Sequence, residues 1–269
     1  MTDHLYTADG DIFTPSPWAG SPWSTTSQHG GPSNALFMRA VENLAADAGM
    51  QPGRLSVDIL KPIPMAPLRL GADFLRRGKR LGVIQAALQR ADDNSLVAIA
   101  RAVALKAHED QVPVFGAPET SYPSPDEAAE CELISEHRKK NGPHGFHFSI
   151  RMRHGGAADD TITWFTWPLD ILEAEAPSPY QRCAAICDLT TVVSGRLAKS
   201  APGTWDNEQQ FLLLNTDTTV HLFRPPVGDW FGFSNTSIAD HRGIGVASAM
   251  LHDEQGPVGR SVQTVASNA

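Results

Sequence analysis

The chain has 269 residues, of which 41% are hydrophobic and 19% charged, and its formal net charge is −8. This composition is typical of an ordinary globular protein and is long enough for one or two domains with a real core. A general nucleic-acid-binding protein usually shows a basic face, so the acidic balance argues against that class without excluding a local basic patch.

The N-terminal sequence MTDHLYTADGD has no basic segment followed by an apolar run, so we expect no signal peptide. No stretch approaches the roughly 18 apolar residues of a membrane helix, and we expect no membrane insertion. Cys131, Cys183 and Cys187 are an odd number of cysteines without framework spacing, which predicts reduced thiols in a cytoplasmic protein. We expect no metal site, because no His pair or second Cys pair accompanies them.

A segment rich in Pro, Gly and charged residues runs from about residue 107 to 145 and predicts a linker between two structured halves. The predicted organisation is an N-terminal unit of residues 1–107, a linker of residues 108–145 and a C-terminal unit of residues 146–269.

In the first half, NALFMRAVENLAADAG has apolar residues at spacing four and predicts an amphipathic helix. Gly30, Gly31 and Pro32 stand at its start, and Gly49 near its end. Turn signals separate the four strands expected next, which are residues 54–60, 68–77, 81–91 and 96–106.

The second half has the same plan, with strand-like residues 147–156 and 161–169 before the helix. Ser178 followed by Pro179 is a typical N-cap and first-turn pair, and predicts one helix over residues 178–199. The strands expected after it are residues 211–223, 230–238, 245–252 and 258–266.

The two halves form a weak internal repeat, which predicts one fold unit present twice. A helix cannot bury its apolar stripe alone, so a sheet must cover it. An offset of 163 residues relates Lys61-Pro62 to Arg224-Pro225, Gly82 to Gly245 and Leu88 to Leu251; after the next turn the offset becomes 161, as in Val97 and Val258.

Asp188 falls within the second predicted helix, and no charged residue lies three or four positions away on either side. Such a carboxylate is paired, lies at a partly exposed edge, or is functional. Buried carboxylates are seldom without partners, which favours a functional role here.

Two amides join it as candidates. By strand alternation Asn215 shares a face with Asp217 and Thr219, which is either a solvent face or the wall of a polar pocket. Gln263 shares a face with Gly259, Ser261 and Val265, and is either an ordinary solvent-facing residue or an amide with space beside it. In a sheet wrapped round a helix, Asp188, Asn215 and Gln263 can converge, and a carboxylate with two amides can orient and deprotonate water. Such a water suits attack on a thioester, whose thiolate leaves readily.

The segments AICDLTTVVSG, NTDTTVHLFRPP and VGRSVQ, in this order, resemble the acyl-CoA thioesterase II family. The resemblance implies an α+β double-hotdog fold, in which two helix-wrapped antiparallel sheets form one continuous sheet. It also implies hydrolysis of acyl-CoA by Asp-activated water, no cofactor besides the coenzyme A of the substrate, and a homo-oligomer. Asn215 stands where the best-known members carry Thr, so this sequence departs from the family there.

The motif SQHGGPSNALF places His29, Gly30 and Gly31 at a helix start. Single-domain hotdog thioesterases resemble it, with an oxyanion donor opposite a carboxylate of the partner helix. This implies that a backbone N–H of Gly30 or Gly31 faces Asp188, with His29 in a structural role; otherwise the glycines only let the chain turn into the helix.

Four cations, Arg76, Arg77, Lys79 and Arg80, cluster at a predicted hairpin turn. They either bind the phosphates of coenzyme A or are simply solvated. Through the repeat, Gln263 corresponds to Ala102, so we expect one competent site per chain.

Three alternatives compete with a thioesterase. A hotdog hydratase or dehydratase carries Asp and His five residues apart, and neither predicted helix opens with such a pair. A non-catalytic acyl-CoA-binding protein would not need Asp188 and Gln263. A serine hydrolase would need G-x-S-x-G at a strand-to-helix turn, whereas GRSVQ at 259–263 lies in a predicted strand.

Overall fold

A computed structural model describes residues 3–107, 122–131, 145–157, 160–194 and 212–268 of the chain. The first half contains β1 (His4–Asp9), β2 (Ile12–Pro15), the 3₁₀ helix η1 (Pro17–Ala19), α1 (Gly30–Asp47), β3 (Gln51–Ile59), β4 (Leu68–Arg77), β5 (Leu81–Arg90) and β6 (Leu96–Leu105). The second half contains β7 (Ala129–Cys131), α3 (Phe146–Ser149), β8 (Arg151–Ala157), β9 (Asp160–Thr166), β10 (Asp170–Leu172), α4 (Pro179–Cys187), β11 (Leu212–Asn215), β12 (Asp217–Leu222), β13 (Phe231–His241), β14 (Ile244–Asp253) and β15 (Gly256–Asn268).

Both main helices begin at the residues that the sequence indicates. The Ser178 hydroxyl accepts the backbone N–H of Gln181, whose side chain accepts the N–H of Ser178 in return, so α4 opens with a capping box. His29 is the N-cap residue of α1, and the N–H of Gly31 points toward its Nδ1. Gly49, at φ +64°, supplies the left-handed residue that ends α1.

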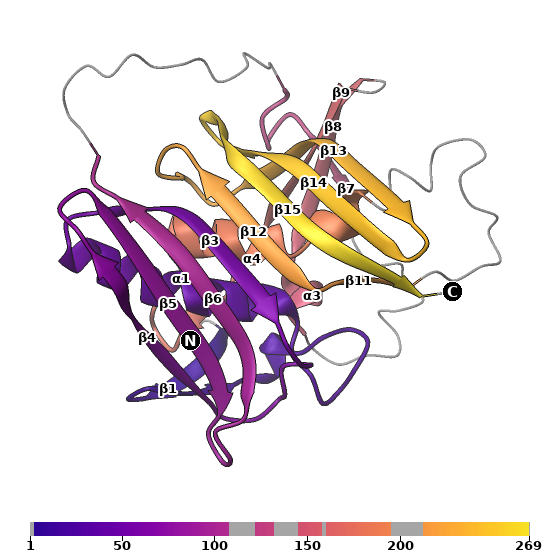
Figure 1. Ribbon diagram of the computed structural model, residues 1–269. Coiled ribbons are helices and arrows are strands. Elements are labelled where there is room, and N and C mark those ends of the chain that lie inside the picture. The colour runs from indigo at the N-terminus through magenta and orange to yellow at the C-terminus, as the bar shows by residue number, and fades with distance from the viewer. Residues whose placement is uncertain (1–2, 108–121, 132–144, 158–159, 195–211, 269) are drawn as a thin grey trace.

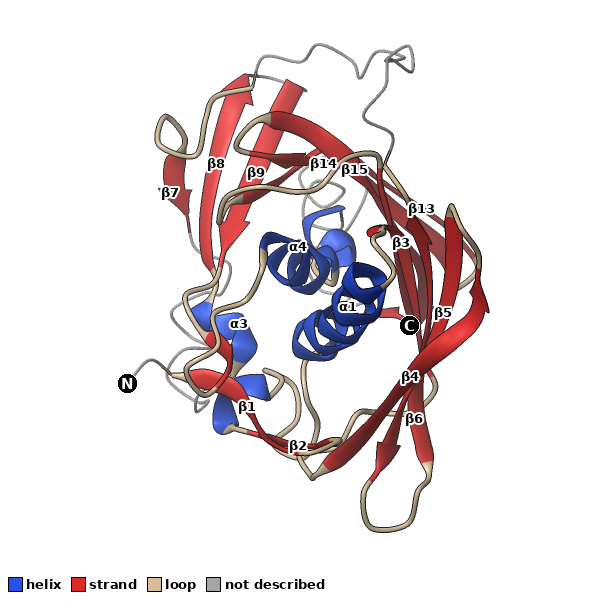
Figure 2. Cartoon of the chain, turned by 90° about the vertical axis from the view of Figure 1, so that its left-hand side faces the viewer, coloured by secondary structure: helices blue, strands red, loops and turns tan. Residues whose placement is uncertain are grey.

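The strands form one sheet in the order β10-β1-β2-β4-β5-β6-β3-β12-β15-β14-β13-β9-β8-β7, with β11 also paired to β15. Antiparallel pairing of β3 with β12 joins the two halves into a continuous surface (Figure 1). The sheet curves around α1 and α4, which lie side by side within it (Figure 2). The double-hotdog arrangement of one continuous sheet around two helices is therefore confirmed.

The strand registers carry the same repeat as the sequence. Leu70 pairs with Leu88 between β4 and β5, and their counterparts Phe233 and Leu251, each 163 residues later, pair between β13 and β14. The sequence offset thus relates residues in equivalent places of two hairpins, as expected for one fold unit present twice.

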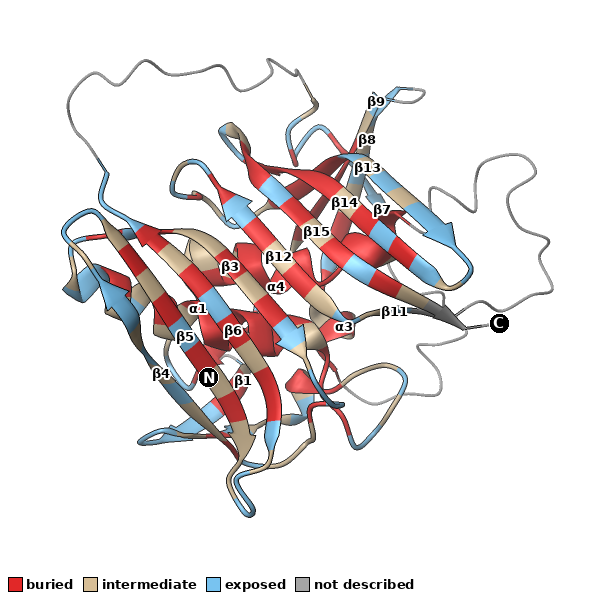
Figure 3. Ribbon diagram, viewed as in Figure 1, coloured by how far each residue is buried: buried red, intermediate tan, exposed pale blue. Residues whose placement is uncertain are grey.

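Burial alternates along the strands that cover the helices (Figure 3). In β6 the inward side chains of Ala98, Ala100, Ala102 and Ala104 are buried, whereas Arg101 between them is exposed. These small inward residues leave room for the helix beneath, so the core lies between the sheet and the two helices.

Several elements were not predicted from the sequence. The N-terminal strands β1 and β2 extend the sheet beyond β4, and β10 pairs in parallel with β1. Within the segment predicted as linker, residues 122–131 lie against the second half, and β7 there pairs with β8. The rest of that segment, up to residue 144, falls outside the described residues.

Candidate active site

Asp188 lies at a break in the second helix. We predicted a continuous helix over 178–199, but α4 ends at Cys187, Asp188 and Leu189 form a turn, and helix resumes over residues 190–194. The hydroxyl of Thr190 donates to the Cys187 carbonyl at 2.8 Å, which gives the backbone an alternative to the regular helical bond. The predicted helix residues beyond 194 lie outside the described part of the chain.

Gln263 holds this break from the sheet side. Its Oε1 accepts the backbone N–H of Thr191 at 2.8 Å and the Thr191 hydroxyl at 2.7 Å. Its Nε2 donates to the Asp188 carbonyl at 3.2 Å and to Thr218 Oγ1 at 2.8 Å. An amide side chain has two donors and two acceptor lone pairs, so Gln263 is saturated. The alternation of β15 correctly placed Gln263 with the buried Ser261 and Val265.

Asn215 reaches the same place from β11, against the prediction from simple alternation. Asn215 pairs with Val265 of β15, and after Thr216 the register shifts by one residue, since Thr219 pairs with Val262. This irregularity breaks the shared face of Asn215, Asp217 and Thr219. Thr219 bonds to Ser56 at the junction of the halves, whereas Asn215 reaches the Asp188 carboxylate. The polar residues of the segment thus serve two different faces.

The carboxylate of Asp188 is nearly enclosed, because the residue is only 6% exposed. Asn215 Nδ2 donates to its Oδ1 at 2.7 Å, and His29 Nδ1 lies 3.0 Å from its Oδ2. A buried carboxylate needs such partners to remain charged. The structure therefore brings Asp188, Asn215 and His29 into direct contact, while Gln263 bonds to the Asp188 backbone.

His29 Nδ1 faces two groups that make opposite demands. The N–H of Gly31 points at it from 3.1 Å, which requires a lone pair, whereas the Asp188 carboxylate at 3.0 Å requires an N–H. One ring nitrogen cannot satisfy both. When Asp188 is ionised, electrostatics favours the Nδ1–H that donates to it, because a carboxylate is a stronger acceptor than a neutral ring nitrogen. The Gly31 N–H is then released from His29.

The two glycines at the start of α1 allow the helices to approach closely. A Cβ on Gly30 would lie 2.5 Å from Asp188 Oδ1, and one on Gly31 would lie 2.6 Å from the Phe146 ring. No larger residue fits either position without movement. The two glycines thus have a role in packing, because they let the first turn of α1 lie directly beside the Asp188 carboxylate.

A cavity of about 310 Å³ opens onto this site. Asp188, Asn215 and Gly30 line its polar end. Three large apolar side chains that line it are unusually exposed to solvent, namely Trp23 at 61%, Leu60 at 48% and Leu214 at 42%. Exposed apolar groups gathered at a cavity are typical of a ligand site. The other lining residues are Ser27, Gln28, Ile59, Lys61, Pro62, Ile63 and Thr216.

The predicted basic cluster lies elsewhere. Arg77 donates to the carbonyl of Asp47, the last residue of α1, whereas Gly30 is its first. At about 1.5 Å per residue, an 18-residue helix separates these points by roughly 25 Å. Arg76, Lys79 and Arg80 belong to the same β4–β5 hairpin and its turn. The structure does not bring this cluster to the cavity.

The first half lacks the equivalent of the site. Counting from the N-caps His29 and Ser178, Asp188 corresponds to Arg39. The repeat relates Asn215 to Pro52, and the registers Ile84–Ala102 and Ala247–Gln263 relate Gln263 to Ala102. None of Arg39, Pro52 and Ala102 can activate water.

Sequence reasoning missed part of the supporting shell. Thr218 and Thr191 bond to Gln263, and Thr190 Oγ1 lies 2.7 Å from Ser261 Oγ. The signal available was the pair of threonines two and three residues after Asp188, since hydroxyl side chains compete with helical hydrogen bonds. His147 was missed as well; its ring centroid lies 5.6 Å from that of His29.

Other reactive groups do not form a competing site in the described residues. The hydrogen bond with Cys187, together with burial, raises the pKa of the Cys183 thiol, so this cysteine is a poor nucleophile. No group of three or more His, Cys, Asp or Glu among the described side chains could hold a metal ion. Nor do the described helices include one that is long and apolar enough to cross a membrane.

Comparison with known families identifies the family of the chain. The sequence model of the acyl-CoA thioesterase N-terminal domain matches residues 19–107, and that of the C-terminal domain matches residues 110–267. The chain belongs to the acyl-CoA thioesterase family. It is therefore a thioester hydrolase, and the predicted family is confirmed. No curated protein matches the chain in a sequence search.

Solved structures agree with this thioesterase fold. A structure from Novosphingobium aromaticivorans has a TM-score of 0.72 at 18% identity, with 98% of this chain and 99% of that chain covered. A TesB protein of Mycobacterium avium subspecies paratuberculosis has a TM-score of 0.68 at 14% identity, with 98% and 96% covered. A dehydratase-cyclase domain of ambruticin biosynthesis is more distant, with a TM-score of 0.54 at 12% identity and 98% and 96% covered.

Proposed function

We propose that this thioesterase hydrolyses acyl-CoA with a water molecule that Asp188 activates. The observation that carries the proposal is the enclosed carboxylate of Asp188 at the end of the cavity, held by Asn215 at 2.7 Å and His29 at 3.0 Å. A positioned carboxylate next to open space is suited to general-base catalysis.

In the proposed reaction, Asp188 takes a proton from water as the water oxygen attacks the thioester carbonyl carbon. The tetrahedral intermediate then collapses and breaks the carbon–sulfur bond. The coenzyme A thiolate leaves and takes up the proton, so the products are a free acid and coenzyme A. Asn215 positions the water, because only one of its amide hydrogens is used by Asp188 and its oxygen has no bond among the described residues.

We assign Gln263 a different role from positioning the water, which is the role that we predicted for it from the sequence. Its four hydrogen bonds leave no donor or acceptor for water. Gln263 therefore acts as a positioning residue that fixes the helix break and so the direction of Asp188.

The oxyanion donor in this proposal is the N–H of Gly30. Gly30 lines the cavity, and its N–H is in the first turn of α1, where helical N–H groups lack intrahelical acceptors. Gly31 is buried behind it against Phe146. Ionised Asp188 and an Nδ1–H on His29 would complete this arrangement, since that proton neutralises part of the carboxylate charge near the developing oxyanion.

The cavity also orients the substrate in this proposal. The apolar residues Ile59, Ile63 and Leu214 suit an acyl group, and Lys61 at the cavity suits a phosphate of coenzyme A. In the second half, the repeat counterpart of Lys61 is Arg224, which forms an ion pair with Asp253. The first-half counterpart of Asp253 is Arg90, so Lys61 has no carboxylate at the equivalent position. Lys61 thus replaces the distant hairpin cations as the proposed phosphate ligand.

A dehydratase is the second candidate, because His29 and Asp188 are in contact and a dehydratase-cyclase shares the fold. A dehydratase would need each side chain to face the substrate separately, one to remove a proton and one to protonate the departing hydroxyl. Here the two side chains bond to each other, which favours hydrolysis.

A homo-oligomer and a cytoplasmic location remain part of the proposal. Cys183 and Cys187 are buried as thiols and not as a disulfide, which suits a reducing compartment.

The deciding experiment measures thiol release from a series of acyl-CoA substrates, from short to long and including aromatic acyl groups, with wild type beside Asp188→Asn. Asp217→Asn is the matched control, because that carboxylate lies on β12 outside the cavity. We expect the Asp188 variant to lose activity by orders of magnitude while it stays folded. Unchanged turnover would contradict the role of Asp188, and dehydration of 3-hydroxyacyl-CoA without thiol release would favour the second candidate.

A further inference from the structure

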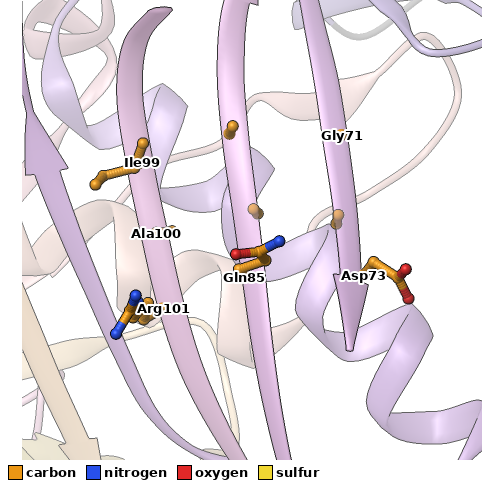
Figure 4. A pocket seen from close by; sticks show the side chains of 9 residues that line it. Gly71, Asp73, Gln85, Ile99, Ala100 and Arg101 are labelled. Carbon is orange, nitrogen blue, oxygen red and sulfur yellow. The ribbon is translucent and has the colours of Figure 1, made fainter. Parts of the chain in front are cut away.

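A second hollow, of about 430 Å³, lies on the outer face of the sheet over β4, β5 and β6 (Figure 4). It shares no lining residue with the cavity at Asp188. The hollow exists because Gly71 and Ala87 are small and pair side by side across β4 and β5. Ile99 pairs with Ala87 on the other side, so one row of the hollow runs from a glycine through an alanine to an isoleucine.

The neighbouring row is charged at both ends. Asp73 pairs with Gln85, and Gln85 pairs with Arg101. All three residues are exposed, and Figure 4 shows them in line across three strands. Neither Asp73 nor Arg101 has an ion-pair partner among the described residues. Strands lie about 4.8 Å apart, so Asp73 and Arg101 stand on strands roughly 10 Å apart, with Gln85 on the strand between them.

We propose that this face binds the same face of a second copy of the chain, about a twofold axis that runs parallel to β5 above Gln85. Such an axis places Asp73 of each copy opposite Arg101 of the other. It also places the two Gln85 amides opposite one another, where each can donate to and accept from its counterpart. A twofold interface is made of one patch that complements itself, and this row satisfies that condition.

The adjacent row fits the same axis. Ile99 of each copy lies over Gly71 of the other, so its large side chain fills the space that the glycine leaves open. Ala87 of one copy faces Ala87 of the other. Facing sheets pack about 10 Å apart, a distance that an Asp and an Arg side chain together can span. Charge and shape thus select the same arrangement.

A second copy explains the row better than a small ligand does. A ligand site gathers its polar groups toward one point, whereas Asp73 and Arg101 stand at opposite sides of the hollow. Their symmetric placement about Gln85 is what a self-complementary contact requires.

The test is a charge swap, followed by analytical ultracentrifugation of the full chain. Asp73→Arg sets Arg against Arg at both ends of the interface, and Arg101→Asp sets Asp against Asp. We expect each single variant to raise the dimer dissociation constant at least ~100-fold, because like charges face each other twice. The double variant D73R/R101D restores both opposite-charge pairs and should return the dissociation constant to within about tenfold of wild type.

Glu173→Arg is the control, since it makes the same charge change at an exposed residue outside the hollow. It should leave association unchanged, and thiol release per chain should be the same in dimeric and monomeric variants. A wild-type chain that stays monomeric at high concentration would overturn the proposal. So would association that the single reversals leave intact, or a double variant that stays monomeric.

Discussion

Ser56 and Thr219 form a hydrogen bond of 2.8 Å between their hydroxyl groups, directly across the strand pair that joins the two halves. They are 163 residues apart, which is the offset of the internal repeat. Each is therefore the counterpart of the other, and the pair lies on the approximate twofold axis that relates the halves. This axis sets α1 and α4 antiparallel, so the start of α1 meets the end of α4. The site at Gly30 and Asp188 is thus built from both halves.

Gly30→Ala should impair catalysis through the position of Asp188. The new Cβ would lie 2.5 Å from Asp188 Oδ1, so the carboxylate must move away from Asn215 and His29. A shift of about 1 Å at a reacting group can lower the rate roughly 100-fold, and we expect a loss of that order in kcat for thiol release. Gly53→Ala is the control, because its Cβ would meet nothing closer than 3.5 Å. Near-normal turnover in G30A would mean that the carboxylate need not stay where it is.

Gln263→Leu and Asn215→Ala should separate stability from catalysis. Replacing Gln263 leaves buried donors and acceptors on Thr191 and Asp188 without partners, so we expect a loss of about 2–4 kcal/mol in the free energy of unfolding as well as lower activity. Asn215 is only partly buried and makes one described bond at the cavity, so its loss should affect turnover far more than unfolding.

Denaturant unfolding and thiol release, measured on the same two preparations, check this division. Thr264→Val, at an exposed position beside Gln263, is the control for changes in β15. If Gln263→Leu keeps wild-type stability and loses only activity, then Gln263 acts on the water and our assignment of its role is wrong.

The sequence was sufficient to predict features that depend on local chemistry. The start of α4 follows from Ser178 and Pro179, and β4 has the bounds that its turn signals indicate. The constant offset of 163 residues correctly relates equivalent positions of two hairpins, as in Leu70–Leu88 and Phe233–Leu251. Each of these rests on residues adjacent in sequence or on a constant offset, so no knowledge of tertiary contacts is needed.

Features that depend on distant partners were beyond prediction. The helix break at Asp188 needs Gln263, which is 75 residues away, to accept the N–H of Thr191. The irregularity at Thr216 reverses the face of Asn215, and a one-residue slip in a strand changes the side on which every later side chain lies. β1 and β10 pair across 166 residues, His4 with Asp170, and their short sequences carry little strand signal.

Asn34→Leu should make the free protein more stable. Asn34 is 1% exposed on α1, and neither its amide nitrogen nor its amide oxygen has a hydrogen-bond partner among the described residues. A buried unsatisfied polar group costs about 1–3 kcal/mol, and leucine has a similar size without polar atoms, so we expect a gain of about that amount in unfolding free energy. Asn43→Leu, at an exposed position of the same helix, should give little change. A loss of stability in N34L would contradict the cost that we assign to the buried amide.

The free energy of unfolding should fall in mild acid because His252 is buried in its neutral form. Burial lowers the pKa of His252 to about 4; nearby Asp253 opposes this shift and Arg224 adds to it. The neutral ring, whose Nε2 lies 2.8 Å from Ser234 Oγ, has Tyr122 packed on it edge to face.

The direction of the effect follows from proton binding. Between the usual histidine pKa, about 6.5, and the folded value near 4, the unfolded chain binds a proton at this residue that the folded chain does not, so stability falls as pH falls through this window. One group with this shift accounts for about 3 kcal/mol by its lower end. Unfolding free energies at pH 7 and pH 4.5 should therefore differ less in His252→Gln than in wild type. His241→Gln, at an exposed position, should keep the wild-type difference. Equal pH dependence in H252Q and wild type would mean that His252 becomes protonated in the folded state as readily as in the unfolded chain.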